Sequence, residues 1–174
     1  MAAALNSPMM TQTSIQIRVA SSDEDMLLAE QFYQMWRDLD VPATAIDPDW
    51  CSIVCQFITQ ARQTLKYQAF IAEVEHEGDR LIVGSASCQL HAGLYPNVLC
   101  PPYRQYGYIW GVYVEPAYRK QGIATQLTTK TIAYLQSIGC THAILNASPL
   151  GQPVYERLGF VKSNMMQLKL GSGE

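Results

Sequence analysis

Three absences in the sequence exclude broad classes of protein. No apolar run reaches the roughly 18 residues that a membrane-spanning helix needs. The first residues, MAAALNSPMMTQTS, contain neither a basic segment nor a long apolar stretch, so they make a poor signal peptide. Charged residues are only 16% of the chain and the formal net charge is −3, whereas a nucleic-acid-binding protein shows a basic balance or stripe. We therefore expect a cytoplasmic protein with no membrane or nucleic-acid partner.

Cysteine and histidine are too few and too poorly spaced to predict a disulfide framework or a metal centre. The sequence has 5 cysteines and 3 histidines, and no two cysteines form a C-x-x-C pair. Cys51 and Cys55 are one helical turn apart, which favours helix packing over a bridge. The histidines are not spaced as zinc ligands. We interpret the cysteines as small buried side chains in a reducing compartment and expect no bound metal.

The length and the apolar content predict one globular domain. The chain has 174 residues, of which 48% are hydrophobic, and this is enough for a sizeable core. No internal repeat or linker divides it. We expect a flexible leader over residues 1–13, a single domain over residues 14–170 and a flexible tail over residues 171–174.

Hydrophobic periodicity predicts a mixture of strands and helices in the order β-α-α-β-β-β-α-β-α-β. Helices are expected at about 21–39, 49–66 and 121–138, with a short one that ends at Leu158. Strands are expected at 14–20, 67–77, 80–91, 106–115, 141–147 and 160–170. Gly78-Asp79 marks a hairpin turn between two of these strands. The connection over 92–105 is long and rich in proline, which is typical of a segment with a function of its own.

Residues 108–130, YIWGVYVEPAYRKQGIATQLTTK, are the stretch around which the chain is organised. A strand-like run enters a turn, a basic loop with a glycine follows, and a helical pattern begins at once. The free N–H groups and the dipole at a helix N-terminus favour an anion such as phosphate. Gly122 lets the backbone approach the ligand, and Arg119 and Lys120 add positive charge. The loop has neither the Walker A nor the dinucleotide spacing, which disfavours a nucleotide-binding α/β protein.

Two motifs resemble those of the GNAT N-acetyltransferase superfamily. The pattern V-x-V-x-P-x-x-R-x-x-G-x-A over 112–124 resembles its acetyl-CoA-binding motif, with Arg119, Gly122 and Ala124 in the three defined positions of [QR]-x-x-G-x-[GA]. The segment YERLGF over 155–160 resembles the Y-E-[KR]-L-G-F that follows the family's fifth strand. The likeness covers 108–161 well and the N-terminal half in outline. It implies an α/β (α+β) fold with a mixed, mostly antiparallel sheet flanked by helices.

The resemblance implies an N-acetyltransferase that uses acetyl-CoA as co-substrate. The acetyl group would pass by direct attack to a primary amine of a small molecule or amino-acid-like acceptor, with no covalent enzyme intermediate. Gly111 is a natural site for the strand bulge that the family places beside the cofactor. Ser148 stands where many family members have Asn. The residues expected to contact the cofactor are Val112, Tyr113, Val114, Arg119, Lys120, Gln121, Gly122, Ile123, Ala124, Thr125 and Ser148.

The same resemblance assigns the general acid to Tyr155 and leaves the general base open. A phenol with a pKa near 10 is protonated at neutral pH and suits the departing CoA thiolate. Tyr108 replaces the glutamate that many members carry on the fourth strand, so a water-mediated path with Tyr108 as a relay is the default. Other groups that could reach the cleft are Glu73, Glu75 and His91.

The acceptor pocket is expected between the loop over 40–49, the long connection over 92–105, Tyr108 and Trp110. The aromatic residues in or near these parts indicate an acceptor with an apolar or cationic body, although for Trp36 packing in the core is the favoured interpretation. Two alternative functions remain beside the small-molecule enzyme: a protein or peptide N-acetyltransferase, and a non-catalytic acyl-CoA-binding regulatory module. A monomer and a homodimer are both compatible with the sequence.

Overall fold

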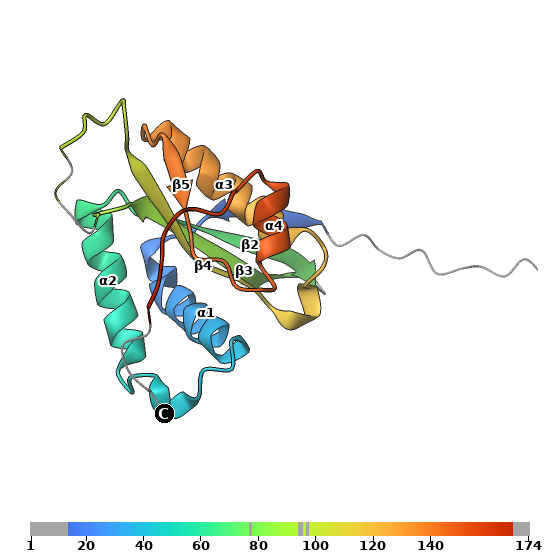
Figure 1. The fold of residues 1–174 in the computed structure, drawn as a ribbon. Helices are drawn as coiled ribbons and strands as arrows, with labels where there is room; N and C mark the ends of the chain where they lie inside the picture. Colours follow the sequence, from blue (N-terminus) through green and yellow to red (C-terminus); the bar gives the residue numbers. More distant parts are fainter. Residues whose placement is uncertain (1–13, 77, 94–95, 97, 169–174) are drawn as a thin grey trace, which may run out of the picture.

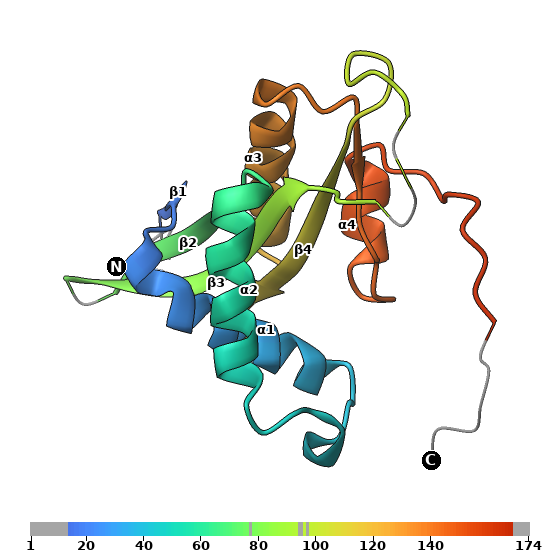
Figure 2. The ribbon, with the colours of Figure 1, turned by 90° about the vertical axis from the view of Figure 1, so that its left-hand side faces the viewer.

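The computed structural model describes residues 14–168, apart from residues 77, 94–95 and 97. The expected leader over 1–13 and the expected tail over 171–174 lie outside the described residues. The described chain forms one sheet with helices on both faces (Figures 1 and 2). No helix within the described ranges is both long and apolar enough to cross a membrane.

The sheet has five strands in the order β1-β2-β3-β4-β5. Neighbouring strands run antiparallel except for β4 and β5, which are parallel, and this confirms the predicted mixed, mostly antiparallel sheet. The predicted hairpin turn lies between β2 and β3, where His76 pairs with Asp79. The strands are β1 (Ile15–Val19), β2 (Gln68–His76), β3 (Asp79–Leu90), β4 (Tyr106–Val114) and β5 (His142–Ile144).

Two apolar cores hold the helices against opposite faces of the sheet. Helices α1 (Asp25–Asp38) and α2 (Trp50–Thr64) cover one face, where Leu28 and Ile58 are among the buried side chains. Helix α3 (Ile123–Ser137) covers the other face through Leu127 and Leu135, which are almost fully buried. The short helix α4 (Gln152–Arg157) packs beside α3. The predicted helix positions are therefore confirmed to within a few residues.

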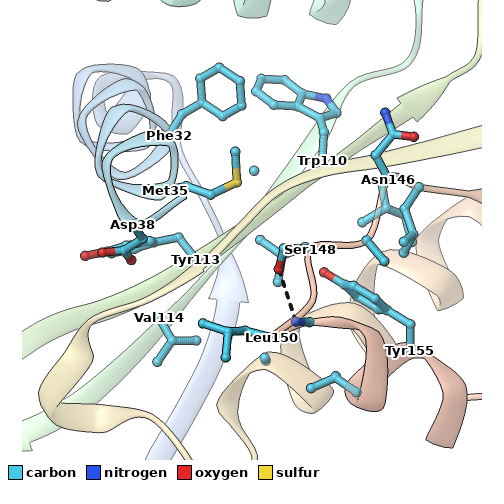
Figure 3. Close-up of a pocket in the computed structure, with 18 of the residues that line it drawn as sticks. Phe32, Met35, Asp38, Trp110, Tyr113, Val114, Asn146, Ser148, Leu150 and Tyr155 are labelled. Atoms are coloured by element: carbon cyan, nitrogen blue, oxygen red, sulfur yellow. Dashed lines mark hydrogen bonds between the residues drawn. The ribbon is translucent and has the colours of Figure 1, made fainter. Parts of the chain in front are cut away.

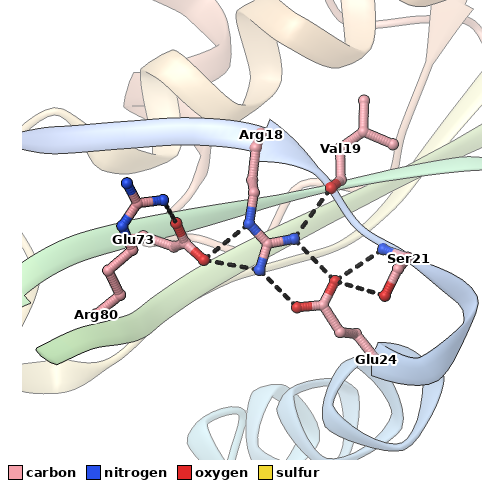
Figure 4. A network of polar contacts seen from close by, with 6 residues as sticks. All are labelled: Arg18, Val19, Ser21, Glu24, Glu73 and Arg80. Carbon is pink, nitrogen blue, oxygen red and sulfur yellow. Dashed lines mark hydrogen bonds and ion pairs between the residues drawn. The ribbon is translucent and has the colours of Figure 1, made fainter.

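The start of α1 is fixed by a network of charged side chains (Figure 4). The guanidinium of Arg18 on β1 donates to the carboxylates of Glu24, at 2.7 Å, and Glu73, at 2.8 Å. Glu24 also accepts a hydrogen bond from the backbone N–H of Ser21 at 2.7 Å, which satisfies a donor at the turn before the helix. Arg80 contacts Glu73 from β3. The network joins the first strand, the first helix and the centre of the sheet.

A bulge in β4 lies where Gly111 adopts a φ of 61°, a left-handed conformation that favours glycine. Ser87 pairs with Trp110 and Ser85 with Tyr113, so two residues of β4 face the single residue between them on β3. The expected bulge at Gly111 is confirmed. It shifts the alternation of side chains along β4 beyond Tyr108, the last residue that pairs with β5.

Strands β4 and β5 separate soon after they pair. Their pairing runs from Tyr106–His142 to Tyr108–Ile144 and stops there, because β5 ends at Ile144 while β4 continues to Val114. One edge of β4 beyond Tyr108 therefore has no partner in β5. This split positions the candidate site.

The predicted strand over 160–170 is wrong in the part that the structure describes. Residues 160–168 contain neither strand nor helix, and residues 169–170 lie outside the described ranges. Val161 and Met166 expose 89% and 95% of their surface, so this segment buries little apolar area that would stabilise pairing. The fifth strand is also shorter than the expected 141–147 and offers only a short edge.

Candidate active site

A cavity of about 1130 Å³ lies at the split between β4 and β5. Residues of α1, α2 and β4 line one part of it, and the loop before α3, residues 145–151 and α4 line the other. Figure 3 shows lining side chains from α1, β4, residues 146–150 and α4. Pockets for one small ligand usually measure about 300–1,000 Å³. This cavity is slightly larger than that range, and its lining residues come from elements on both faces of the sheet.

The loop before α3 brings most of its predicted contact residues to the cavity. Gly122 adopts a φ of 79° at the N-terminus of α3, and a Cβ built there would meet no atom within 4 Å. The first N–H groups of a helix have no partner within the helix, so the end of α3 can bind an anion. Arg119, Lys120, Ile123 and Ala124 line the cavity. The other three residues predicted to contact the cofactor here are next to lining residues but outside the described lining of the cavity: Gln121, Gly122 and Thr125.

Arg119 is held within the protein and does not simply add charge to the loop as expected. Its Nε donates to the carbonyl oxygen of Val114 at 2.8 Å, and its Nη2 donates to the carboxylate of Asp38. The guanidinium also lies 5.6 Å from the centre of the Tyr113 ring. Asp38 is at the end of α1, so Arg119 joins the loop to that helix and shares its charge with a carboxylate.

The strand residues predicted to contact the cofactor, Val112, Tyr113 and Val114, all line the cavity beyond the point where β5 ends. The hydroxyl of Tyr113 donates to the carboxylate of Glu115 at 3.2 Å. Burial, with the nearby Glu115 charge as a further cause, raises the pKa of Tyr113 to about 12. Its phenol is therefore neutral at physiological pH and acts as a fixed donor to Glu115.

Tyr155 on α4 points its hydroxyl into the cavity (Figure 3). The side chain is buried, and burial raises its pKa above the ordinary value for a phenol. Gly151 fits closely beneath the ring, since a Cβ there would lie 3.0 Å from Tyr155 Cε2. A neutral, buried phenol with its oxygen in the cavity has the chemistry of a general acid.

Ser148 lines the cavity but is also part of the turn that carries Tyr155. Its Oγ accepts a hydrogen bond from the backbone N–H of Gly151 at 3.1 Å (Figure 3). Its carbonyl oxygen accepts from the N–H of Gln152 at 2.9 Å. The sequence predicted a cofactor contact here. The structure adds a local function, which is to hold the turn before α4.

An apolar chamber forms the part of the cavity between α1, α2 and β4. We define this chamber by Phe32, Trp36, Ile53, Phe57 and Trp110. The ring of Trp110 lies edge-on to Phe32 and Phe57, with ring centres 5.2 Å and 5.5 Å apart. Trp36 is 41% exposed, so the interpretation that it packs in the core is wrong. It reaches the cavity because it lies near the end of α1, beyond the most buried turns.

The loops expected to line the acceptor pocket contribute less than predicted. Tyr108 and Trp110 line the cavity as expected, but within the described lining no residue comes from 40–49 or 92–105. Asp38 and Leu39, the residues just before the expected loop over 40–49, line the cavity in its place. Trp50 instead stacks on Tyr33, with ring centres 4.6 Å apart. Tyr95 lies outside the described residues.

None of the carboxylates or histidines proposed as bases belongs to the described lining of the cavity. Glu73 is engaged by Arg18 and Arg80, and Glu115 accepts from Tyr113. Among the described lining residues the one carboxylate is that of Asp38, which is paired with Arg119. The hydroxyl of Tyr108 accepts from Nδ2 of Asn146 at 3.0 Å, so β4 and the segment after β5 are joined across the split.

Sequence reasoning missed several lining residues for identifiable reasons. Phe32, Ile53 and Phe57 follow the helical spacing of core residues, and periodicity does not separate a core from a cavity wall. Asp38 and Asn146 carry no motif. The described residues bring together no group of three or more His, Cys, Asp or Glu side chains suited to a metal ion.

Comparisons with known proteins agree with this geometry. Residues 27–160 match the model of the Acetyltransferase (GNAT) family. The matched region contains the strand split, the glycine-bearing loop at the start of α3 and the buried tyrosine on α4. The fold and the site are therefore those of an acetyltransferase. The chain belongs to the GNAT acetyltransferase family.

Relatives and solved structures of the same fold are similar to this chain. A glucosamine 6-phosphate N-acetyltransferase of Trypanosoma brucei brucei is 33% identical over 95 residues, which are 55% of this chain and 60% of that protein. A GCN5-related N-acetyltransferase from Ralstonia eutropha has a TM-score of 0.74 at 21% identity, covering 90% of this chain and 99% of that one. A Clostridium acetobutylicum protein crystallised with acetyl-CoA has a TM-score of 0.73 at 23% identity, covering 90% and 97%.

Proposed function

We propose that this protein transfers the acetyl group of acetyl-CoA to the primary amine of a small molecule. One observation carries the proposal: the cavity joins the start of α3, whose free N–H groups can accept an anion, and a separate apolar chamber through the split between two strands. A buried tyrosine hydroxyl lies in the same cavity. Membership of the GNAT family and the acetyl-CoA bound in a structure of the same fold support the choice of donor.

In the proposed reaction the amine nitrogen attacks the thioester carbonyl carbon directly. A C–N bond forms, the C–S bond breaks, the nitrogen loses a proton and the departing sulfur gains one, so the products are an N-acetyl amide and free CoA. The thioester is already activated, and the reaction requires no covalent enzyme intermediate.

The donor would lie along the unpaired edge of β4, with its pyrophosphate at the start of α3. The first N–H groups of α3 and the side chain of Lys120 would hold the phosphates. The backbone of Val112 to Val114 has no partner in β5 and, apart from the Val114 carbonyl that accepts from Arg119, would offer hydrogen bonds to an extended arm. An N–H there would also polarise the acetyl carbonyl, as preorganised donors do for developing oxyanions.

Tyr155 would give its proton to the CoA sulfur. For the amine proton, the described lining offers no histidine and no unpaired carboxylate, so we propose that a water molecule near Tyr108 and Asn146 carries it to solvent. This assignment makes Tyr155 the side chain with direct proton transfer and leaves Tyr108 as an orienting group.

Calorimetric titration with acetyl-CoA and a thiol-release assay over a panel of amines test the proposal. The panel includes glucosamine 6-phosphate, the acceptor named for the trypanosomal relative. We expect micromolar binding and release of CoA with at least one amine. Binding without release on every amine would favour a non-catalytic acyl-CoA-binding module, and absence of binding would overturn the assignment of the donor site.

A matched pair of variants locates the donor site. Ala124→Trp places a large ring in the cavity at the first turn of α3, and we expect it to weaken acetyl-CoA binding at least tenfold. Thr129→Trp adds the same ring to the same helix at an exposed position outside the described lining, and we expect unchanged affinity. Equal affinities in the two variants would exclude the start of α3 as the phosphate site.

A further inference from the structure

We propose that the acceptor is a primary amine on a neutral apolar body, aromatic or aliphatic, and that sugar phosphates are poor acceptors. This inference rests on the proposed function and names the substrate class. It starts from the apolar chamber, whose defining side chains come from three elements: Phe32 and Trp36 from α1, Ile53 and Phe57 from α2, and Trp110 from β4.

The chamber presents carbon surface, and its side chains are accessible. Phe57 is 44% exposed and Ile53 is 50% exposed, although both belong to the wall of a cavity. Large apolar side chains that remain exposed side by side mark a surface at which an apolar ligand or partner is bound. Here they lie within a cavity that continues to the donor site, so the fitting occupant is the apolar body of the acceptor.

The defining side chains of the chamber offer few polar atoms. The indole Nε1 of Trp110 donates to Oε1 of Gln89 at 3.2 Å. Phe32, Ile53 and Phe57 have no polar side-chain atoms, so the indole N–H of Trp36 is the one further donor among the defining residues. A polyhydroxylated acceptor would therefore lose its hydrogen bonds to water without gaining equivalent partners from these walls, which is unfavourable.

None of the chamber's defining side chains is charged, and the basic residues of the cavity come from other elements. The cavity's described basic residues are Arg119 and Lys120 in the loop before α3 and Arg157 on α4. Arg119 is further compensated by Asp38 at the end of α1. A phosphate monoester carries about −1.5 to −2 charges at neutral pH, and burying it requires paired cations. The chamber supplies none among its defining residues, whereas the donor side has the cations that the CoA phosphates need.

The first experiment compares amines with the full-length protein at saturating acetyl-CoA. The probes are 2-phenylethylamine, a butylamine-to-hexylamine series, ethanolamine and glucosamine 6-phosphate, with CoA release as the readout. We expect kcat/KM to be at least tenfold higher for 2-phenylethylamine than for ethanolamine. In the alkylamine series kcat/KM should rise about fourfold with each added methylene, since each buried methylene gives a nearly constant gain.

The outcomes separate this inference from the proposed function. If acetyl-CoA binds and glucosamine 6-phosphate or ethanolamine is acetylated as efficiently as 2-phenylethylamine, the inference is overturned and the function stands. If acetyl-CoA does not bind, the proposed donor site is wrong. If no amine reacts, binding of 2-phenylethylamine to the CoA complex is measured by the fluorescence of the tryptophans in the chamber; absence of saturable binding overturns the inference.

Variants of the chamber provide the second test. Phe57→Gln and Ile53→Gln each replace a partly exposed apolar side chain on α2 by glutamine, a polar residue that is well tolerated in helices. We expect each to raise the KM for 2-phenylethylamine about tenfold, with unchanged affinity for acetyl-CoA and unchanged circular dichroism. Met26→Gln on α1 is the control, because Met26 is 70% exposed and lies outside the described lining. A KM equal to that of the control in both chamber variants would contradict the inference.

Discussion

Arg119 donates a hydrogen bond to the carboxylate of Asp38, a residue 81 positions earlier in the chain. The contact ties the loop before α3 to the last residue of α1. These two elements line different parts of one cavity, the first at the proposed donor site and the second at the apolar chamber. The ion pair is thus a direct link between the two halves of the site.

Asp38→Asn removes the carboxylate charge and leaves Arg119 uncompensated beside the proposed phosphate site. We expect tighter binding of acetyl-CoA, by about two- to fivefold at low salt, with the gain lost at high salt through screening. The free energy of unfolding should change by less than about 1 kcal/mol, because the pair is partly exposed. Calorimetry at two salt concentrations measures the effect. Glu30→Gln makes the same charge change on the exposed side of α1 and is the control. If Asp38→Asn binds acetyl-CoA more weakly and Glu30→Gln does not, the ion pair between Asp38 and Arg119 instead serves to order the loop before α3.

Tyr155→Phe removes the hydroxyl from the cavity and keeps the ring. General acid catalysis usually contributes about 10²- to 10⁴-fold, so we expect kcat to fall by about a hundredfold with little change in acetyl-CoA affinity. Tyr134→Phe is a matched control, because its hydroxyl bonds to the carbonyl of Lys66 outside the described lining of the cavity. Full turnover by Tyr155→Phe would move the general acid to another group.

The pH dependence of the reaction distinguishes a water-mediated path from a side-chain base. Burial raises the pKa of Tyr155 above the ordinary value of about 10, so this acid stays protonated and no alkaline fall in kcat is expected below about pH 10. Alkylamines with a pKa of about 10 are mostly charged at neutral pH. Without a base in the cavity, kcat/KM should therefore rise close to tenfold per pH unit from about pH 6 to pH 9. A plateau that begins near pH 7 would reveal a titrating base that the described lining does not contain.

The charged network at the start of α1 makes stability depend on pH. Hydrogen bonds from Arg18 and Ser21 lower the pKa of Glu24 from 4.5 to about 2 (Figure 4). A carboxyl whose pKa is depressed on folding stabilises the protein above its unfolded pKa. The contribution is lost as the pH falls from about 4.5 towards 2. We expect Glu24→Gln to cost roughly 2 kcal/mol at pH 7 and little at pH 2.5, as measured by chemical unfolding. Asp23→Asn, at an exposed neighbour, should show no such difference between the two pH values.

The fold was predictable from sequence wherever a local pattern decides the structure. The helical spacing of Val54, Ile58 and Ala61 places α2 against the sheet, and these three side chains are its buried residues. Gly111 was a natural site for a bulge in the expected strand, and its positive φ and the register shift beside it confirm that position. The loop motif and the YERLGF motif likewise led to residues that share a cavity, because the first marks the junction from β4 to α3 and the second marks α4, the helix that follows β5.

The parts that could not be predicted depend on contacts between residues far apart in the sequence, or on which elements pack beside a segment in the fold. No local pattern pairs Asp38 with Arg119, since both are common charged residues at element ends. The stripe that buries Leu28 also runs on to Trp36, and only the position of β4 decides where core becomes cavity wall. The segment over 160–168 has the composition of a strand, but pairing needs a neighbour, and β5 ends after three residues.

The strand split also bears on how firmly the backbone is held before any ligand arrives. Beyond Tyr108, the edge of β4 that faces away from β3 has no hydrogen-bonded neighbour in β5. Amide protons on such an edge exchange with solvent far faster than those between paired strands. A ligand that lies along Val112 to Val114 would complete the sheet in place of a strand. It would slow deuterium uptake there and raise the melting temperature by mass action.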